Sequence, residues 1–535
     1  MAVSTPQAEG GLVLLASQPR RAGWWALALG VLAATGFQPL GLWPLALLAA
    51  GLFALIVART SGWREAALLG WLFGMGHFTF GNSWIATAFT YQAEMPTVLG
   101  WLAVPLLSVY LAIYPAIAAG AARALARKGP GWDFALVFAG CWIVAEWLRS
   151  WVFTGYAWNP FAMVLLGPFE RPGLALLAPI MGTYALSGFA MLLGWALVAA
   201  ARARRWAVLA SGVAVLAAGM YLPQPALRET DLSLTIAQPD IEQSDVHEPA
   251  LYEDHFRRLA ANSLPKTPGE RRIVLWPESG MVDYLREGYP QRYYDSTTAF
   301  GSPVLARRRL AGVIGENSLL MTGAVDLEIG EKDGLTRALG ARNAVTVLND
   351  QGHIVGSYYK AHLVPFGEYL PMRWLLEPLG LSRLVPGAID FWPGPGLRTL
   401  DLGAYGKAAI QICYEIVFSG EVVEKGTRPD YIFNDSTDGW FGAFGPPQHF
   451  AQARMRAIEE GLPVLRSTTT GISGVIDAHG VVRQHLGMRI EGRIDGKVPA
   501  AAAPTLFSRF GNALGLAWAA VALLAGLIAM RRRAG

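Results

Sequence analysis

A succession of apolar stretches fills the first 222 residues, and this feature constrains the fold more than any other. Seven stretches precede residue 225 and an eighth lies near the C-terminus, each close to the roughly 20 residues that a helix needs to cross a bilayer. Only 16% of the residues are charged and the mean hydropathy is +0.33, whereas a soluble chain carries about a quarter charged residues. We therefore expect a polytopic α-helical membrane protein, with spans at 22–39, 42–58, 66–88, 97–121, 134–154, 174–200, 205–222 and 511–530.

The positions of Lys and Arg predict the orientation of these spans. In short loops these residues collect on the cytoplasmic side of a membrane. Every second connection between the spans carries Lys or Arg, and the connection 82–98 holds none. Only Arg149 and Arg171 do not fit this alternation. The residues that agree are Arg20, Arg21, Arg59, Arg64, Arg123, Arg127, Lys128, Arg202, Arg204, Arg205, Arg531, Arg532 and Arg533. Both termini are thus predicted in the cytoplasm and the polar segment of about 231–500 in the periplasm, at a bacterial inner membrane. A second span follows the first at once, which favours a retained helix over a cleaved signal.

The chain changes character near residue 225, because only six of its 40 acidic residues precede that point. We predict a transmembrane domain of seven helices at 1–225, a periplasmic domain at 226–505, and a C-terminal transmembrane helix with a basic tail at 506–535. The periplasmic part alternates β-rich runs with helical stretches, which indicates an α/β fold. The predicted strands are 232–236, 273–276, 344–348, 354–359, 408–412 and 431–433, with a hairpin turn at 349–352 and helices at 251–262 and 449–460.

Composition excludes several classes of protein. The 44 basic and 40 acidic residues are too nearly balanced for a nucleic-acid-binding surface, so no nucleic-acid partner is expected. Two cysteines cannot form a disulfide framework, and the eight His residues are too scattered for a metal site. We expect neither a metal nor another cofactor.

Three predicted strands end on reactive side chains, namely Glu278, Lys360 and Cys413. Taken singly, each residue has a commoner interpretation. A lone Cys after an apolar strand is more often a small buried side chain, and a Glu or Lys at a strand end is more often a solvated surface charge. Together they are complementary, because a thiol needs a base, a nearby cation lowers its pKa, and a carboxylate can supply the base. Sites in α/β proteins collect beyond the carboxyl ends of strands, so the three predict one nucleophilic site if their strands are neighbours.

The residues around these strand ends resemble the Glu-Lys-Cys signatures of the nitrilase superfamily, and in particular its apolipoprotein N-acyltransferase family. The motifs are Trp276-Pro277-Glu278, Lys360-Ala361-His362-Leu363-Val364-Pro365-Phe366-Gly367-Glu368 and Ile412-Cys413-Tyr414-Glu415-Ile416. They occur in the family's order, and the resemblance covers nearly the whole chain.

The resemblance implies a four-layer αββα sandwich on a membrane base. Glu278 would be the general base, Lys360 would stabilise the oxyanion and Cys413 would be the acylated nucleophile. The resemblance also implies auxiliary roles for Glu368, Tyr414 and Glu415 and contacts of Asn343, Trp440 and Phe441 with the substrate or as a lid. The implied reaction moves an acyl chain from a phospholipid to the N-terminal amine of a diacylated apolipoprotein in the bilayer, and we expect a monomer.

Two places depart from the family pattern. Val246-His247 stands where many members have Lys-Trp, and Thr437-Asp438 stands where many have Asn-Asp. We expect neither to touch the nucleophile.

Alternative interpretations remain at this point. His362 or His449 could activate the thiol in place of Glu278. A membrane-tethered amidase or nitrilase that hydrolyses a C–N bond would share the three residues, and a transporter or receptor would need none of them. Glu146 and Arg149 in the fifth apolar span fit either a pair at a helix end or a contact with lipid headgroups.

Overall fold

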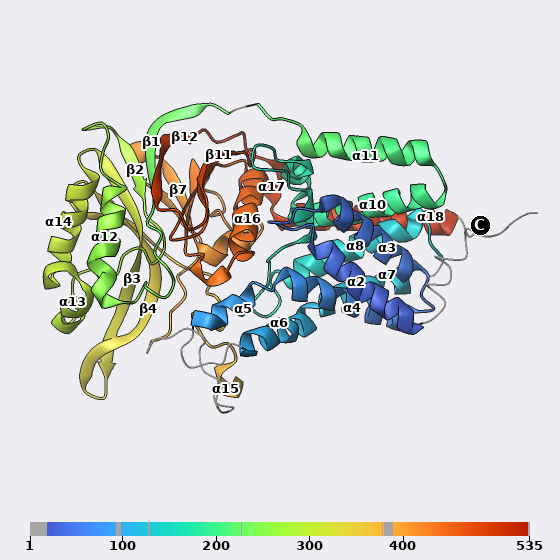
Figure 1. Ribbon diagram of the computed structural model, residues 1–535, viewed down its shortest axis with the longest axis horizontal. Coiled ribbons are helices and arrows are strands. Elements are labelled where there is room, and N and C mark those ends of the chain that lie inside the picture. The colour runs from blue at the N-terminus through green and yellow to red at the C-terminus, as the bar shows by residue number, and fades with distance from the viewer. Residues whose placement is uncertain are drawn as a thin grey trace, which may run out of the picture.

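The computed structural model describes residues 19–91, 98–126, 129–225, 227–376, 378 and 389–532. A bundle of apolar helices forms one end of the molecule and a β-sandwich forms the other (Figure 1). The main helices of the bundle are α2 (Pro19–Ala34), α3 (Trp43–Ala58), α4 (Trp63–Gly81), α6 (Val98–Leu111), α7 (Ile113–Leu125), α8 (Trp132–Arg149), α10 (Thr183–Arg202), α11 (Trp206–Tyr221) and α18 (Asn512–Arg532).

Within the described residues, three helical stretches are long and apolar enough to cross a membrane: Val98–Leu125, Thr183–Arg202 and Asn512–Arg532. Shorter apolar helices occupy Arg21–Ala34, Trp43–Ala58 and Trp206–Tyr221. The predicted span 174–200 is broken, because Gly182 has a φ of 76° and separates α10 from the short helix α9 (Ala178–Met181). The predicted span 66–88 likewise ends early at Gly81, and the short helix α5 (Ile85–Ala88) follows it.

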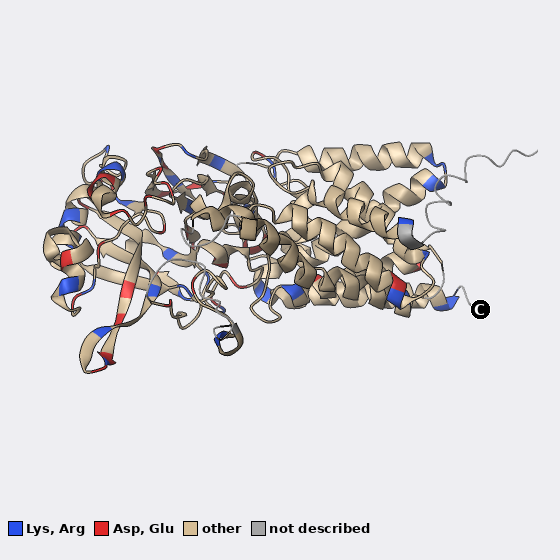
Figure 2. Cartoon of the chain, turned by 60° about the horizontal axis from the view of Figure 1, so that its bottom comes forward, with Lys and Arg blue, Asp and Glu red and all other residues tan. Residues whose placement is uncertain are grey.

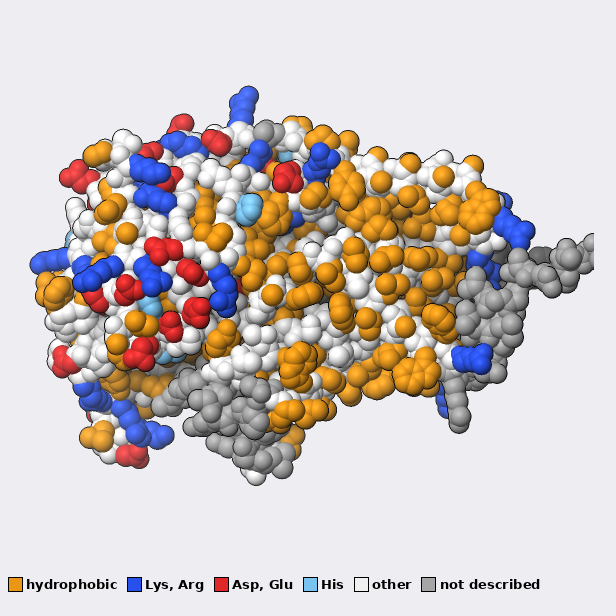
Figure 3. All heavy atoms as spheres, viewed as in Figure 1, with side chains coloured by type: hydrophobic (Ala, Val, Ile, Leu, Met, Phe, Trp, Pro, Cys, Tyr) orange, Lys and Arg blue, Asp and Glu red, His pale blue; other side chains and the backbone are white. Residues whose placement is uncertain are grey.

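The surface of the bundle is largely apolar along its length. Figure 3 shows hydrophobic side chains over the helices and charged ones over the sandwich. Leu102, Leu106 and Leu524 are among the exposed apolar residues of the bundle. Lys and Arg gather at the end of the bundle that points away from the sandwich (Figure 2). Arg127, Lys128 and Arg533 lie outside the described residues.

The sandwich consists of two six-stranded sheets. The first has the order β12-β1-β2-β3-β4-β5, and the second has the order β11-β10-β9-β8-β7-β6. Their bounds are β1 (Glu229–Gln238), β2 (Arg272–Leu275), β3 (Ser318–Lys332), β4 (Leu335–Asn349), β5 (Ile354–Tyr359), β6 (Thr399–Asp401), β7 (Lys407–Ile412), β8 (Tyr431–Ser436), β9 (Val464–Thr468), β10 (Ser473–Ile476), β11 (Val482–Leu486) and β12 (Gly492–Pro499). All six predicted strands are present, and β4 and β5 form the predicted hairpin.

Alternation along each strand builds the layers. Ile273 and Leu275 of β2 face the core between the sheets, whereas Val274 packs toward α12 (Tyr252–Ala261) and α14 (Pro303–Ile314). In the second sheet Phe433 faces the inner core and Ile432 packs against α16 (Gly445–Glu460). Helices thus cover the outer face of each sheet.

Helix α16 joins the two halves of the molecule (Figure 1). Phe450, Ala453 and Ala457 pack against the second sheet, while Met455 and Ile458 belong to the core of the helical bundle. All residues of α16 except Pro447 are buried, because the helix is packed between the second sheet and the bundle. The second sheet is therefore fixed to the bundle through a shared layer.

Candidate active site

Three strand ends bring the predicted residues together. Glu278 follows β2, Lys360 follows β5 and Cys413 follows β7. All three are buried, with relative exposures of 5%, 2% and 5%. Cys413 has a φ of 51°, in the left-handed region that non-glycine residues rarely adopt, so the turn at the thiol is strained.

Lys360 lies between two carboxylates. Its Nζ is 3.0 Å from Glu368 Oε1 and 3.7 Å from Glu278 Oε1. Burial alone would lower the pKa of Lys360, but Glu368 and Glu278 raise it above its usual value. Lys360 therefore stays a cation inside the site and can stabilise an oxyanion.

Two amide groups orient the Glu278 carboxylate. Asn343 Nδ2 donates to Glu278 Oε1 at 2.6 Å and to Glu368 Oε1 at 3.1 Å. The backbone N–H of Thr437 donates to Glu278 Oε2 at 2.9 Å, and the thiol of Cys413 lies 3.7 Å from the carbonyl oxygen of Thr437. The expectation that position 437 does not touch the nucleophile is thus wrong, because its backbone contacts both Glu278 and Cys413. The other departure, Val246, is buried at a separate turn.

The thiol is protonated at rest. Burial, followed by the nearby Glu278 charge, raises the pKa of Cys413, and Lys360 opposes that rise. Burial also raises the pKa of Glu278, against the lowering effect of Lys360. A carboxylate with a raised pKa is a stronger base, so this arrangement suits proton transfer from Cys413 to Glu278.

Glu415 ties the strand ends of the two sheets together. It accepts hydrogen bonds from the backbone N–H groups of Ile412, Ala361 and His362, at 2.8, 2.7 and 3.1 Å, and from the Tyr358 hydroxyl at 3.0 Å. These donors flank Lys360 on one side and Cys413 on the other. Glu415 is therefore a structural bridge, while Tyr414 is buried and packs edge-on against Phe418.

Neither histidine contacts the sulfur. His449 Nε2 bonds to the backbone carbonyl of Cys413 at 3.0 Å, and His362 Nε2 bonds to the carbonyl of Thr154 at 3.0 Å. Burial, followed by Arg466, lowers the pKa of His449. His449 Nδ1 lies 2.9 Å from an oxygen of the Asp438 carboxylate and 3.0 Å from the Arg466 guanidinium, which itself binds Asp438 at 2.8 Å. This buried cluster holds the ring while Nε2 donates to the backbone of the nucleophile.

Trp440 and Phe441 form a short turn, η9 (Gly439–Phe441), against the helical bundle. The Trp440 ring meets the Tyr91 ring edge-on at 5.8 Å, and the Phe441 ring lies 4.8 Å from the Trp84 ring. Gly442 has a φ of 55° and passes so close to Thr87 that a Cβ would lie 2.7 Å from the threonine hydroxyl. The η9 turn thus contacts α5 and the residues on either side of this helix.

Asp435 is a further residue near Glu278, and the sequence analysis did not predict it. It is fully buried on β8, and a Cβ added to Gly323 would lie 3.0 Å from its Oδ2 and 2.7 Å from Glu278 Cα. Burial, followed by the Glu278 charge, raises the pKa of Asp435 well above its usual value. No local sequence pattern predicts that Asp435 lies near Glu278, because their proximity depends on how the two sheets face each other. Among the described residues, no group of three or more His, Cys, Asp or Glu side chains is arranged to hold a metal ion.

Comparisons with known proteins match the two parts of the chain to two family descriptions. Residues 260–503 match the carbon-nitrogen hydrolase family, and residues 29–196 match the apolipoprotein N-acyltransferase N-terminal domain. The chain is 32% identical to an apolipoprotein N-acyltransferase of Rhodopseudomonas palustris, with 95% of each chain covered. It is 34% identical to one of Bradyrhizobium diazoefficiens, with 95% of this chain and 94% of the relative covered.

Among solved structures, a nitrilase-superfamily amidase of Nesterenkonia AN1 aligns at 15% identity over 52% of this chain and 94% of its own, with a TM-score of 0.33. The family matches define the class: a nitrilase-like catalytic domain combined with an apolar helical domain. The chain belongs to the apolipoprotein N-acyltransferase family, and it is a multi-pass membrane acyltransferase.

Proposed function

We propose that this acyltransferase moves an acyl chain from a membrane phospholipid to the α-amino group of the N-terminal diacylglyceryl-cysteine of an apolipoprotein, through a thioester on Cys413. The observation that carries the proposal is the buried Lys360 between Glu278 and Glu368, beside the thiol. This arrangement provides a nucleophile, a base and an oxyanion partner within one site.

In the first half-reaction Glu278 takes the Cys413 proton and the thiolate attacks the ester carbonyl of the phospholipid. Lys360 stabilises the tetrahedral oxyanion, a contribution typically of about 3 kcal/mol. The ester C–O bond breaks, and Glu278 returns its proton to the leaving alkoxide. A lysophospholipid departs and the acyl thioester remains on Cys413.

In the second half-reaction the acceptor amine, deprotonated by Glu278, attacks the thioester carbonyl. The C–S bond breaks and the thiolate leaves and is reprotonated. The product is an amide, which is more stable than a thioester and makes this step favourable. Glu368 and Asn343 act by holding Lys360 and Glu278 in place, as their hydrogen bonds indicate.

The helical bundle gives both lipid substrates access to this chemistry. We propose that all eight apolar stretches span the inner membrane, with 1–225 as the first transmembrane part, 226–505 in the periplasm and 506–535 as the last helix and tail. Moving a chain of about 16 carbons into water would cost about 13 kcal/mol, at about 0.8 kcal/mol per methylene. A site held at the membrane surface avoids that cost, and we propose that Trp440 and Phe441 form a lid that contacts lipid.

The test is a transfer assay with both substrates. Purified protein is mixed with vesicles of a phospholipid bearing a deuterated acyl chain and with a synthetic peptide that begins with S-diacylglyceryl-cysteine. We expect the peptide to gain one deuterated acyl chain in amide linkage. Release of free deuterated fatty acid with an unmodified peptide would instead indicate hydrolysis and contradict the proposed acceptor.

A further inference from the structure

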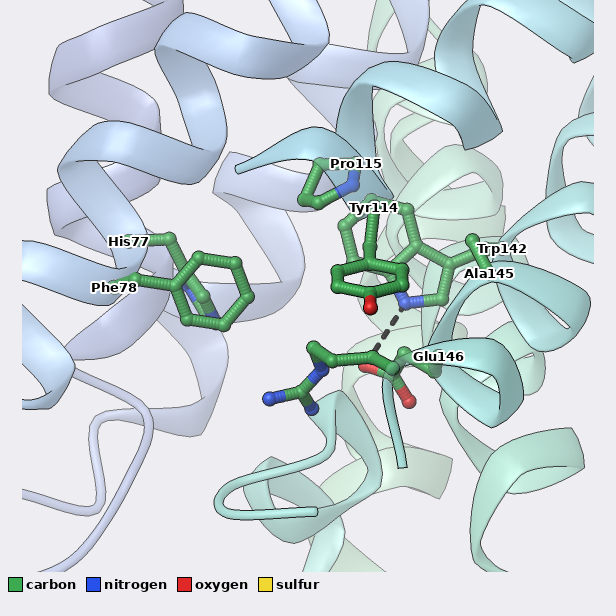
Figure 4. A pocket seen from close by; sticks show the side chains of 8 residues that line it. His77, Phe78, Tyr114, Pro115, Trp142, Ala145 and Glu146 are labelled. Carbon is green, nitrogen blue, oxygen red and sulfur yellow. Dashed lines mark hydrogen bonds between the residues drawn. The ribbon is translucent and has the colours of Figure 1, made fainter. Parts of the chain in front are cut away.

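Two charged residues, Glu146 and Arg149, are buried at the end of α8. Glu146 lies beside a small cavity that His77, Tyr114 and Trp142 also line (Figure 4). Glu146 Oε1 accepts from the Trp142 indole at 3.1 Å and from the backbone N–H of Phe161 at 2.8 Å.

Arg149 is the second of these residues, and it is also buried. Its guanidinium donates to the carbonyl of Trp158 at 2.8 Å. Arg149 therefore holds the loop that follows α8, residues 150–160, and Glu146 holds Phe161, the residue that follows the loop. Arg149 is directed inward instead of toward lipid headgroups.

The 150–160 loop in turn contacts the catalytic domain directly. The indole N–H of Trp158 and the side-chain amide of Asn159 both donate to Gln448 Oε1, at 2.9 and 2.8 Å. Gln448 is buried on the first turn of α16. One carbonyl oxygen thus receives two hydrogen bonds from the helical bundle.

The residue after Gln448 supports the nucleophile. His449 donates to the carbonyl of Cys413, and its ring lies 5.2 Å from the Trp158 ring. Cys413 holds a strained φ of 51°, and a strained backbone persists only where its surroundings determine it. An unbroken series of contacts therefore leads from α8 through the loop and α16 to the backbone of the thiol.

We propose that Gln448 is a positioning residue, which fixes His449, and through it the Cys413 backbone, against the 150–160 loop of the helical bundle. This inference rests on the proposed role of Cys413 as the acylated nucleophile. It makes the helical bundle part of the catalytic geometry as well as a membrane anchor.

The same helix provides a matched control. Gln452 lies one turn further along α16 and is fully buried, but neither of its amide atoms has a hydrogen-bond partner among the residues described. Gln448→Leu removes the shared acceptor, whereas Gln452→Leu removes only an amide that bonds to nothing there.

The experiment measures single-turnover acylation of the full-length enzyme by phospholipid vesicles without acceptor, followed by intact-protein mass spectrometry. For Gln448→Leu we expect the rate constant at saturating lipid to fall at least about tenfold while the final amplitude stays complete. For Gln452→Leu we expect the wild-type rate constant. A role in folding alone would lower the amplitude of Gln448→Leu and leave its rate constant unchanged, and this result would overturn the inference.

A second variant keeps the test informative if Gln448→Leu does not fold. Trp158→Phe keeps a ring next to His449 and removes only the indole donor, so we expect a smaller fall in the same rate constant.

The variant that combines Trp158→Phe with Gln448→Leu should be no slower than Gln448→Leu alone, because both changes break the same contact. Additive losses would contradict the proposed series of contacts.

Failure of the proposed function gives a different result. If the wild-type enzyme forms no adduct on accessible lipid, then the thioester proposal fails. If it forms the adduct and Gln448→Leu does so equally fast, then only the positioning role fails.

Discussion

At the residue scale, the site depends on one buried cation between two carboxylates. Lys360 Nζ is within 3.7 Å of both Glu278 and Glu368, and the low exposure of the three side chains keeps bulk solvent from screening their charges. Removing one member of such a buried cluster leaves the others uncompensated. Catalysis and stability should therefore fail together at this position.

We predict that Lys360→Met lowers the rate of acylation of Cys413 by about 10²- to 10³-fold, because the oxyanion loses its partner. The same change should destabilise the protein by roughly 3 kcal/mol, because the buried Glu278 and the half-buried Glu368 then lose the cation between them. Acylation kinetics and thermal melting in detergent measure the two effects. Lys407→Met, at a partly exposed lysine, is the control and should alter neither. Normal acylation in Lys360→Met would contradict the assigned role.

The buried bridge Glu415 predicts a pH dependence of stability. Burial raises the pKa of Glu415 to about 7 from an ordinary 4.5, against the lowering effect of the N–H groups of Ile412 and His362. The folded chain therefore binds this proton more tightly than the unfolded chain does. Its contribution to the free energy of unfolding is fully present below about pH 4.5 and is lost as the pH rises through about 7.

Glu415→Gln provides the comparison, because the amide stays neutral. Between about pH 5 and pH 8 the stability of the wild type relative to the variant should fall by roughly 3 kcal/mol. Melting temperatures of both proteins across this range measure the difference. A difference that stays constant across this range would mean that Glu415 is ionised in the folded protein under all these conditions, and it would contradict the prediction.

At the scale of elements, the η9 turn is held by aromatic contacts with the helical bundle. Trp440 packs on Tyr91, and Phe441 packs on Trp84 and Trp158. Contacts of this kind contribute about 0.5–1.5 kcal/mol each beyond the area that they bury. The turn is thus positioned by residues far from it in the sequence.

We predict that Trp440→Ala slows acylation by vesicle phospholipid about two- to tenfold, the equivalent of one lost aromatic contact. Acylation by a water-soluble short-chain thioester should change less, because that donor needs no lipid contact. The ratio of the two rates is the measurement, and Trp132→Ala, at an exposed tryptophan of α8, is the control. Equal losses with both donors would show that Trp440 has no specific contact with lipid.

Some strands and contacts of this fold can be predicted from the sequence, and others cannot. The strand 354–359 matches β5 in full, because an apolar run between a turn and a lysine has clear limits. The long strand β3 was missed because Gly323, Asp326 and Gly330 interrupt its apolar pattern. The motifs predicted Glu278, Lys360 and Cys413, and the structure places them together. The contacts of Thr437 and Asp435 join segments far apart in the chain, and no local pattern encodes them.

At the scale of the whole molecule, the distribution of charge predicts the orientation in the membrane. The sandwich carries most of the acidic residues, and Lys and Arg gather at the opposite end of the bundle (Figure 2). Because positive residues stay on the cytoplasmic side, the sandwich should face the periplasm.

Single cysteines introduced at two exposed positions test this orientation. Asp333→Cys lies at the turn between β3 and β4, and Arg204→Cys lies between α10 and α11. A membrane-impermeant maleimide applied to intact spheroplasts should label Asp333→Cys and leave Arg204→Cys unlabelled until lysis. The native Cys141 and Cys413 are both buried, so wild-type protein is the background control. The reverse labelling pattern would place the catalytic domain in the cytoplasm.

Intact-protein mass spectrometry can detect the proposed thioester on Cys413 itself. The purified enzyme is incubated with phospholipid vesicles and no acceptor, beside Cys413→Ala. We expect the wild-type enzyme to gain the mass of one acyl chain. Hydroxylamine should remove this gain, and Cys413→Ala should not show it. No adduct on the wild type with accessible lipid, or an equal adduct on Cys413→Ala, would contradict the proposed thioester.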